Sequence, residues 1–540
     1  MLGAAMLEPL NTRRPRLLLV LFCLLLWLPG FTTLPPGDRD ESRFVQATKQ
    51  MLETGDLVRI RNGDEARNRK PIGIHWLQLP FAGAARALGI AGANPVWPYR
   101  LPSLLGGLLA VLATHEIGRR LLDRRAALLG AGVLAASVVL VVETHIAKTD
   151  AALLGATALA MGVLARAWQS PARLGPGGAA LFWLALAAGV LIKGPILPMV
   201  AGLAALALAL WERRAAWLLA LRPAWGAPLM LAAVLPWFVA IGVATEGRFF
   251  ADAVGGDLGR KLASGDESHW GPPGLHLLLL PLLIFPATAA LPGALWSAWR
   301  DRADPAVRFL AAWAGPAWIV FEAAPTKLPH YTLPLLPALC LLLARFALLP
   351  GAAPRWAWRL GAGLTVLAAA VLGAGAVALP VLLREGVWLG LPGLAAAALV
   401  AWLALRRPGA RGVLAGLAAV PLVYWAVLGL ELPRLRPLWI APRVVEALRQ
   451  HPPATLGAVG FHEPSLMVLA GTGTRWLATG EDGARALAEG RVGALLVEGR
   501  NLAAFREEAS RLGLRPRELD RIEGFNISRG RWVALTLFGA

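Results

Sequence analysis

The stretch Leu17-Leu-Leu-Val-Leu-Phe-Cys-Leu-Leu-Leu-Trp-Leu28 contains no charged side chain and follows the basic sequence Arg13-Arg14-Pro15-Arg16. A helix needs about 20 mostly apolar residues to cross a bilayer, so this run predicts a membrane span over residues 17–34. Twelve further segments have the same character, at residues 99–117, 126–142, 150–167, 178–193, 195–211, 226–244, 273–297, 306–323, 330–349, 358–383, 387–405 and 412–430. The chain is therefore predicted to be an all-α polytopic membrane protein with about 13 transmembrane helices.

The composition excludes an ordinary soluble enzyme. Of the 540 residues, 57% are hydrophobic and 16% are charged, whereas a soluble domain has about 45–50% and about 25%. The net charge is +19, but the basic residues lie between the apolar runs, as in membrane proteins, so we expect no nucleic-acid partner. Cys23 and Cys340 both lie inside apolar runs, which excludes a disulfide framework.

Arginines in the short loops predict the orientation. After the basic N-terminus, every second loop is rich in arginine: Arg119/Arg120/Arg124/Arg125, Arg166/Arg173, Arg213/Arg214/Arg222, Arg300/Arg302/Arg308, Arg345/Arg355/Arg359 and Arg406/Arg407/Arg411. Arginine-rich loops face the cytoplasm. Thirteen spans then place the long loop 35–98 and the C-terminal segment outside. No small-x-small cleavage site follows Leu28, so the first span is expected to be a membrane helix rather than a signal peptide.

The outer loops carry a different set of ionisable side chains. All six lysines are there: Lys49, Lys70, Lys148, Lys193, Lys261 and Lys327. Asp40, Glu41, Asp150, His269 and His330 lie on the same side. Ionisable groups at membrane depth are expensive and indicate function. Lysines suit a phosphate, and carboxylates suit a general base or the hydroxyl and amino groups of a sugar.

Each outer segment also has an ordinary structural explanation. Residues 35–98 would then form solvated juxtamembrane helices, over the patterns at 44–52 and 74–88. Thr149 or Asp150 would cap the helix that begins at residue 150. Lys327 and Tyr331 would anchor the tenth span at the interface. We favour function because acidic, basic and aromatic groups converge on one membrane face.

A transporter or lipid flippase is the alternative from another class. Such proteins usually contain internal repeats and place charges at the bilayer midplane. This sequence shows no repeat, and its charges lie at one face. The pattern therefore favours an enzyme acting on a lipid-linked substrate.

From residue 433 onward the composition becomes that of a soluble domain. Helical patterns at 443–450, 483–488 and 502–512 alternate with strand-like runs at 456–460, 493–497 and 532–538. This alternation predicts a small α/β domain outside the membrane. The expected organisation is a transmembrane domain at 1–432 and a periplasmic domain at 433–540.

An ordered series of short motifs resembles one known family. The motifs are Asp40-Glu41-Ser42-Arg43-Phe44, residues 51–56, Lys70-Pro71-Ile72-Gly73, Lys148-Thr149-Asp150, Lys193-Gly194-Pro195, Pro236-Trp237-Phe238, Leu258-Gly259-Arg260, His269-Trp270-Gly271-Pro272, Lys327-Leu328-Pro329-His330-Tyr331, residues 460–466 and residues 524–532. Together they resemble the ArnT-type aminoarabinose transferases, which are GT-C membrane glycosyltransferases related to the protein O-mannosyltransferases. The resemblance covers nearly the whole chain.

This resemblance implies a multi-pass protein of the bacterial inner membrane that performs an inverting transfer at the outer, periplasmic face of that membrane. The donor would be undecaprenyl phosphate carrying 4-amino-4-deoxy-L-arabinose or a similar sugar, and the acceptor a lipid A phosphate. Asp40 would be the main catalytic carboxylate with Glu41 beside it, and Asp150 a second essential acid. The donor phosphate would be held by Lys70, Arg260, Tyr331 and Lys327, and the other active-site residues would be Arg43, Lys193, His269 and His330.

One departure from the family concerns a metal. Family members often have Glu immediately before the lysine that matches Lys70, where it joins a histidine in a metal site. Arg69 occupies that position here and leaves only His269. A single histidine beside an arginine is a poor site for a divalent cation. We therefore expect no metal or other cofactor, and Arg69 is placed to meet an anionic acceptor or the donor phosphate.

The acceptor stays open at this point. A lipid A phosphate is already ionised, so Asp40 would orient the sugar or stabilise charge at its anomeric carbon. A hydroxyl acceptor on a protein or another glycan, used by a hexosyl- or mannosyltransferase, would make Asp40 a general base. The expected partners are the lipid-linked donor, one of these acceptors and membrane lipids, with the chain as a monomer.

Overall fold

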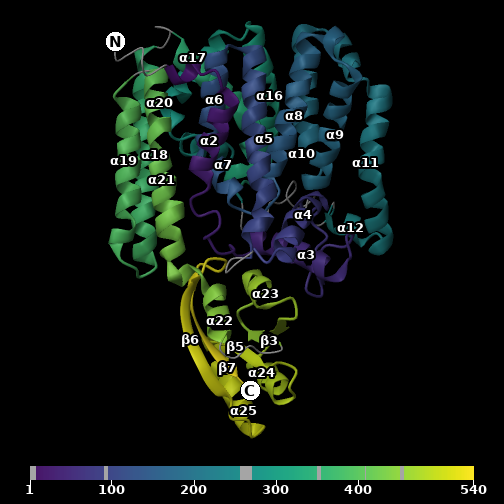
Figure 1. Ribbon diagram of the computed structural model, residues 1–540, viewed down its shortest axis with the longest axis vertical. Coiled ribbons are helices and arrows are strands. Elements are labelled where there is room, and N and C mark those ends of the chain that lie inside the picture. Colours follow the sequence, from purple (N-terminus) through teal and green to yellow (C-terminus); the bar gives the residue numbers. More distant parts are fainter. Residues whose placement is uncertain are drawn as a thin grey trace.

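The computed structural model describes residues 8–90, 95–253, 255, 270–349, 354–407, 409–449 and 455–539. Each predicted span coincides with a helix or with a broken series of helices (Figure 1). These are α2 (Pro15–Trp27), α5 (Trp97–Leu121), α6 (Arg124–Ala136) with α7 (Val138–Thr144), α8 (Asp150–Gln169), α9 (Pro176–Lys193), α10 (Ile196–Glu212), α11 (Pro223–Ala244), α14 (Leu275–Leu283) with α15 (Leu291–Arg300), α16 (Pro305–Ala323), α17 (Leu336–Leu348), α18 (Arg355–Leu382), α19 (Leu391–Leu405), and α20 (Ala410–Ala419) with α21 (Pro421–Tyr424). Among the described residues, eight helices are long and apolar enough to cross a membrane, or nine if α6 and α7 form one bent span.

Several predicted spans are not the continuous helices that the sequence suggested, and two of them show the reason. The segment 126–142 bends by 59° at Ser137, which is extended between α6 and α7. The segment 273–297 is interrupted after α14, and Pro286 precedes a short 3-10 turn (Ala287–Ala290) before α15 begins. Proline lacks the N–H that a continuous helix needs. A hydropathy pattern does not register such a break, because both halves remain apolar.

The turn at Lys193-Gly194-Pro195 is the predicted helical hairpin. α9 ends at Lys193 and α10 begins at Ile196. Gly194 has a φ of 70°, which residues with a Cβ rarely adopt. The reversal leaves the Lys193 side chain at the end of α9 that lies beside the start of α8, where it reaches Asp150.

Small residues bring the central helices into close contact. A Cβ on Gly155 of α8 would lie 2.7 Å from the carbonyl oxygen of Gly106 on α5. In contrast, α11 exposes Val243 (77% exposed) and α14 exposes Leu278 (75% exposed). Large exposed aliphatic side chains at the edge of the bundle suit contact with lipid rather than water. The bundle therefore has a tightly packed centre and an apolar rim.

The long loop folds into two helices and a small hairpin. α3 (Asp40–Thr54) and α4 (Gly73–Ala87) lie at one end of the bundle (Figure 1). Between them, β1 (Arg61–Asn62) pairs antiparallel with β2 (Glu65–Ala66). The helical patterns predicted at 44–52 and 74–88 are confirmed. The loop is a folded platform that carries Asp40 at the first position of α3.

The C-terminal segment forms a five-stranded sheet below the bundle in Figure 1. Its strand order is β4-β3-β5-β7-β6, with β3 parallel to β4 and β5, and β7 antiparallel to β5 and β6. The strands are β3 (Leu456–Val459), β4 (Arg475–Leu477), β5 (Ala494–Glu498), β6 (Arg517–Asn526) and β7 (Arg531–Gly539), and the helices are α22 (Ile440–Leu448), α23 (Pro464–Ala470), α24 (Gly480–Ala488) and α25 (Leu502–Arg511). The predicted small α/β domain is present; the sequence patterns missed β4, β6 and α23, since β6 is mostly polar and exposed.

This sheet domain is attached to the loop helix α3. The Lys49 ammonium donates to the Val468 carbonyl oxygen at 2.9 Å, and the Gln46 amide donates to the Thr472 hydroxyl at 2.8 Å. The Arg39 guanidinium donates to the Ser528 carbonyl oxygen at 2.6 Å. Figure 1 shows α23 drawn next to α3. The domain thus holds the segment that carries Asp40.

Candidate active site

A polar cavity of about 630 Å³ lies where α3, the 67–70 segment, the start of α8, the end of α9 and the turn before α17 meet. It brings together seven predicted residues: Asp40, Arg43, Lys70, Asp150, Lys193, His330 and Tyr331. Arg69 also lines it, with Asp38, Arg67 and Lys148. A volume of this size falls in the range of about 300–1,000 Å³ typical of small-molecule sites.

Asp150 is the most enclosed acid of the cavity. It begins α8, and its Oδ1 lies 2.5 Å from the Lys193 ammonium and 3.7 Å from the His330 Nε2. Its Oδ2 lies 3.8 Å from the Lys148 ammonium. Thr149 makes no side-chain hydrogen bond to the backbone of α8. The start of α8 is thus organised by ion pairs rather than by the capping side chain considered from the sequence.

A second buried acid, Glu143, completes this cluster from the end of α7. Its Oε1 lies 2.9 Å from the Lys148 ammonium and 3.6 Å from the His330 Nδ1. Lys148 and His330 therefore each lie between two carboxylates. Burial lowers the pKa of Lys148, but the carboxylates of Asp150 and Glu143 outweigh it and the pKa is raised overall. Lys148 is held as a cation beside the cavity.

Lys193 links the acid cluster to the aromatic wall. Its ammonium lies 5.4 Å from the centre of the Tyr331 ring, within the range of a cation–π contact. Tyr331 and His330 come from the short helix η6 (Pro329–Leu335) that leads into α17. This turn brings both rings to the ends of α8 and α9.

Asp40 has the opposite environment to Asp150. Its side chain is 63% exposed, and its Oδ1 lies 3.9 Å from the Arg67 guanidinium. Arg67 also lies over the Phe44 ring, 4.5 Å from its centre. Asp40 is therefore accessible to a molecule in the cavity, while Asp150 is surrounded by the protein's own cations.

Glu41 lies outside the cavity lining and is 5% exposed. It accepts two hydrogen bonds from the buried Arg100 of α5, at 2.7 and 3.0 Å, and others from the backbone N–H groups of Gly37 and Ala147. Arg100 also donates to carbonyl oxygens at residues 31, 34 and 35. These bonds fix α3 against the segment that leads to Lys148. The position of Glu41 favours a positioning role over the catalytic role predicted for it.

One other predicted residue that the structure describes, Lys327, is not among the lining side chains. Lys327 is 5% exposed and donates to the carbonyl oxygens of Gly271 and Ala324, at 2.9 and 2.6 Å, instead of facing the cavity. It therefore braces the chain near Trp270 rather than anchoring at an interface. Arg260 and His269 lie outside the described residues.

Sequence reasoning missed Glu143, Arg100 and Asp38. Glu143 and Arg100 stand as single charges near the ends of apolar runs, a signal that could have singled them out. Asp38 lines the cavity and faces the sheet domain. Burial raises the pKa of Asp38 to about 6, with a smaller rise from Glu463 and an opposing effect of the Ser465 hydrogen bond. No local pattern could place Asp38 beside residues more than 400 positions away.

The described residues contain no group of three or more His, Cys, Asp or Glu side chains that could hold a metal ion. The cavity lining instead has more cations than anions. The lining contains seven cationic side chains and four acidic ones. The cations are Arg39, Arg43, Arg67, Arg69, Lys70, Lys148 and Lys193, and the acids are Asp38, Asp40, Glu65 and Asp150. Such a lining suits a ligand that carries phosphate together with polar groups for the carboxylates.

The fold and the cavity define the class: a polytopic membrane protein with a polar site at one end of its helical bundle, beside a folded loop. Its fold is the GT-C fold of ArnT. The crystal structure of ArnT from Cupriavidus metallidurans bound to undecaprenyl phosphate matches 96% of this chain and 97% of that chain, with a TM-score of 0.75 and 20% identity. The apo structure of the same protein matches with a TM-score of 0.73 over the same shares of both chains and the same identity.

The sequence comparisons point to the same group. Residues 70–239 match the family model described as dolichyl-phosphate-mannose-protein mannosyltransferase. The chain is 30% identical over 328 residues to an undecaprenyl phosphate-alpha-4-amino-4-deoxy-L-arabinose arabinosyl transferase of Pseudomonas paraeruginosa, over 59% of this chain and 55% of the relative. A Pseudomonas aeruginosa protein of the same name is 30% identical over 360 residues, 64% of this chain and 61% of the relative. The chain thus spans less than two thirds of the length of these relatives. The predicted resemblance to the ArnT-type family is confirmed by these matches.

Proposed function

We propose that this protein is a glycosyltransferase that moves a sugar, 4-amino-4-deoxy-L-arabinose or a close analogue, from undecaprenyl phosphate to an anionic acceptor such as a lipid A phosphate. The observation that carries the proposal is the cavity in which Asp40, Asp150, Lys70, Lys193 and Tyr331 meet. The name of the Pseudomonas relatives supports the donor and the sugar.

The reaction would be one displacement at the anomeric carbon. An acceptor oxygen forms a bond to that carbon while the bond to the donor phosphate oxygen breaks, and undecaprenyl phosphate leaves. The negative charge that develops on the leaving phosphate is stabilised by nearby cations. Lys70 and Lys193 line the cavity and would stabilise the leaving phosphate, and Tyr331 forms the wall beside Lys193.

The two acids would act differently. Asp40 is exposed to the cavity, so it meets the sugar and stabilises positive charge developing at the anomeric carbon. Asp150 is already paired with Lys193, so it holds that ammonium in place and accepts from the sugar's polar groups. Arg69, which lines the same cavity, meets the acceptor phosphate.

The orientation of the chain is part of this proposal. The arginine-rich loops lie at the opposite ends of the helices from the cavity. The positive-inside rule therefore supports a periplasmic position for the cavity and the sheet domain. The division into a transmembrane domain at 1–432 and a periplasmic domain at 433–540 follows from the same orientation.

Mass spectrometry of lipid A tests sugar and acceptor together. Cells with the wild-type gene should carry lipid A heavier by one pentosamine than cells without it. Asp40→Asn should abolish the difference, because the change removes a charge and barely alters shape. Asp64→Asn, an exposed change in the turn between β1 and β2, is the control and should retain the modification. Wild-type modification by Asp40→Asn would refute the site.

A second acceptor class is favoured by one specific observation, the match of residues 70–239 to a family model described as a protein mannosyltransferase. A hydroxyl acceptor must lose a proton, and the exposed Asp40 would take it as general base. Unchanged lipid A, together with hexose on periplasmic proteins that is lost in the Asp40→Asn strain, would establish this acceptor instead.

A further inference from the structure

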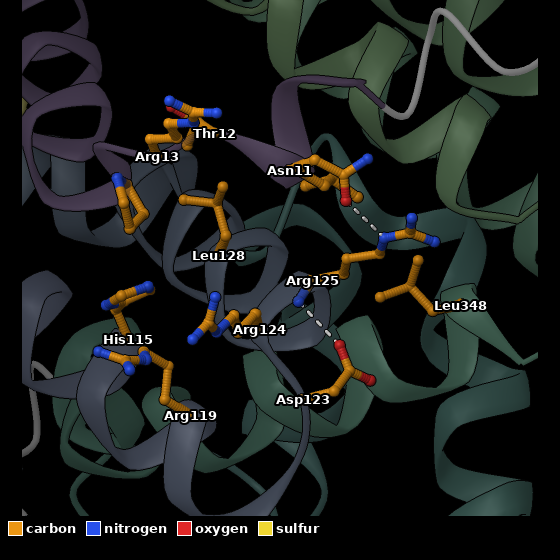
Figure 2. A pocket seen from close by; sticks show the side chains of 12 residues that line it. Asn11, Thr12, Arg13, His115, Arg119, Asp123, Arg124, Arg125, Leu128 and Leu348 are labelled. Atoms are coloured by element: carbon orange, nitrogen blue, oxygen red, sulfur yellow. Dashed lines mark hydrogen bonds between the residues drawn. The ribbon is translucent and has the colours of Figure 1, made fainter.

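A second basic cavity lies at the other end of the bundle. Its volume is about 740 Å³, and it lies between the N-terminal segment, the end of α5 and the start of α6. Figure 2 shows its lining, with Arg13 and Arg119 on opposite sides of the view and Arg125 joined to Asn11. Arg100 binds Glu41 near the start of α5, and Arg119 of the same helix lines the second cavity, so at 1.5 Å per residue these two positions are about 29 Å apart along α5.

The lining is strongly cationic. Four arginines contribute to it, Arg13, Arg119, Arg124 and Arg125, and Asp123 is the one carboxylate among the described lining side chains. Asp123 is already occupied, because its Oδ1 accepts from the backbone N–H groups of Arg125 and Ala126 at 2.7 and 3.0 Å. The lining side chains therefore carry a net charge of about +3. Of the four arginines, Arg119 also lies 3.7 Å from Glu116, which is not a lining residue.

Some other arginines on this side of the bundle have acidic partners among the described residues. Arg16 binds Glu116 at 2.9 Å, Arg308 binds Glu212 at 3.0 Å, and Arg345 binds Asp301 at 2.9 Å. In the part of the chain that the structure describes, Arg13 and Arg124 have no ion pair or side-chain hydrogen bond. Two guanidinium groups with open donors thus face one hollow from different segments.

The remaining lining is partly apolar. Leu10 and Leu128 are 5% exposed each, and Pro15 and Leu348 are also apolar. Asn11, Thr12 and His115 add polar groups. A cavity with arginines and buried leucines suits a ligand with a charged group attached to an apolar one. Guanidinium groups match phosphate oxygens in two-point hydrogen bonds, and basic pockets between membrane helices bind phospholipid head groups.

We propose that this cavity binds a phosphate group, and that the phosphate belongs to the head group of an anionic membrane phospholipid or to a free phosphate ion. Arg13, Arg119, Arg124 and Arg125 hold the phosphate oxygens, and the leucines contact the attached glycerol and the first methylenes of the lipid. This site is separate from the proposed donor cavity and does not depend on the proposed reaction.

Native mass spectrometry of the purified, delipidated full-length protein tests the site. Cardiolipin or phosphatidylglycerol is added, and the bound fraction is compared between wild type and Arg13→Gln/Arg124→Gln. Two lost charge-assisted contacts should weaken retention by at least about tenfold. The control is Arg355→Gln/Arg359→Gln, which removes the same charge from exposed positions at the start of α18 and should bind as wild type.

Inorganic phosphate distinguishes the two sources of the ligand. If millimolar phosphate displaces the lipid from the wild type, the free ion suffices; if the lipid stays, the head group with its chain is the ligand. The variant Arg124→Lys keeps the charge without the two-point geometry and should give intermediate retention. Equal lipid and phosphate binding by the cavity variant, the control and the wild type would overturn the proposal.

Discussion

At the Asp150 end of the bundle, Lys148 and Lys193 lie against buried acids, whereas at the other end Arg13 and Arg124 line a hollow. Lys148 and Lys193 contact Asp150 or Glu143 at 2.5 to 3.8 Å, and both acids are at most 6% exposed. Arg124 and Arg125 are exposed at the other end. Two cavities of similar volume and similar sign of charge are thus constructed differently.

The two ends of the bundle should differ in how well they tolerate the substitution of a charged residue. A buried ion pair that loses one partner leaves an uncompensated charge, which is strongly destabilising. Exposed charges interact weakly and are screened by salt. The Asp150 end should therefore depend on the identity of every neighbour, and the Arg124 end on total charge. The following predictions test that contrast, beginning with the largest effect.

Lys70→Ala should lower sugar transfer by about 10²–10³-fold, because it removes a cation placed to stabilise the leaving phosphate. The measurement is release of undecaprenyl phosphate from a lipid-linked sugar donor in proteoliposomes. Lys49→Ala is the matched control. Lys49 lies on the same loop but donates to Val468 of the sheet domain, so its loss should cost far less. Equal losses in both variants would contradict the assignment of Lys70.

Glu143→Gln should lower the free energy of unfolding by about 3 kcal/mol, since it leaves Lys148 and His330 with one acid instead of two in a buried cluster. Thermal unfolding in detergent measures it. Glu116→Gln at the opposite end breaks the half-exposed pair with Arg16 and should cost at most about 1 kcal/mol. If the two variants were equally stable, the contrast between the two ends would fail.

Asp38 gives the structure a pH dependence that Asp38→Asn should remove. The raised pKa of about 6 exceeds the ordinary value of 3.8, so the folded protein binds more protons than the unfolded chain between these values. The free energy of unfolding therefore falls as the pH rises from about 4 to 6, by up to about 3 kcal/mol. Unfolding temperatures at pH 4 to 7 should show this fall in wild type and Asp64→Asn, but not in Asp38→Asn.

The spans and the first site residues were predictable because apolar runs and their flanking charges are local signals. Asp150, Lys193 and Tyr331 each stand at the end of a predicted span, and the fold brings those ends together. The break at Ser137 was not predictable, since apolar residues continue on both sides of it. That break shapes the end of α7 that carries Glu143, so the acid could not be assigned to the cluster in advance.

Glu41 and Lys327 show a second limit of prediction from the sequence. Both are charged residues inside the motifs that resemble the ArnT-type family. From the local sequence alone, they are as good candidates for the active site as Asp40 and Lys70. Only the packing reveals that Glu41 is bound by Arg100 and that Lys327 is bound by two carbonyl oxygens. Long-range partners decide whether a charged side chain faces a substrate or the protein itself, and those partners are not visible in a short stretch of sequence.

The smallest effect is expected from the double variant Arg13→Gln/Arg124→Gln on transfer itself. The two positions line the same cavity as Arg119, which is about 29 Å from Arg100 along α5, well beyond the Debye length of about 8 Å at physiological salt. Transfer should stay within about twofold of wild type, and each exposed change should alter stability by no more than about 0.5 kcal/mol. The assay is undecaprenyl phosphate release in proteoliposomes, alongside Lys70→Ala. A tenfold loss would mean that the two ends of the bundle are coupled, and that the arginine cavity serves the reaction instead of acting as an independent lipid site.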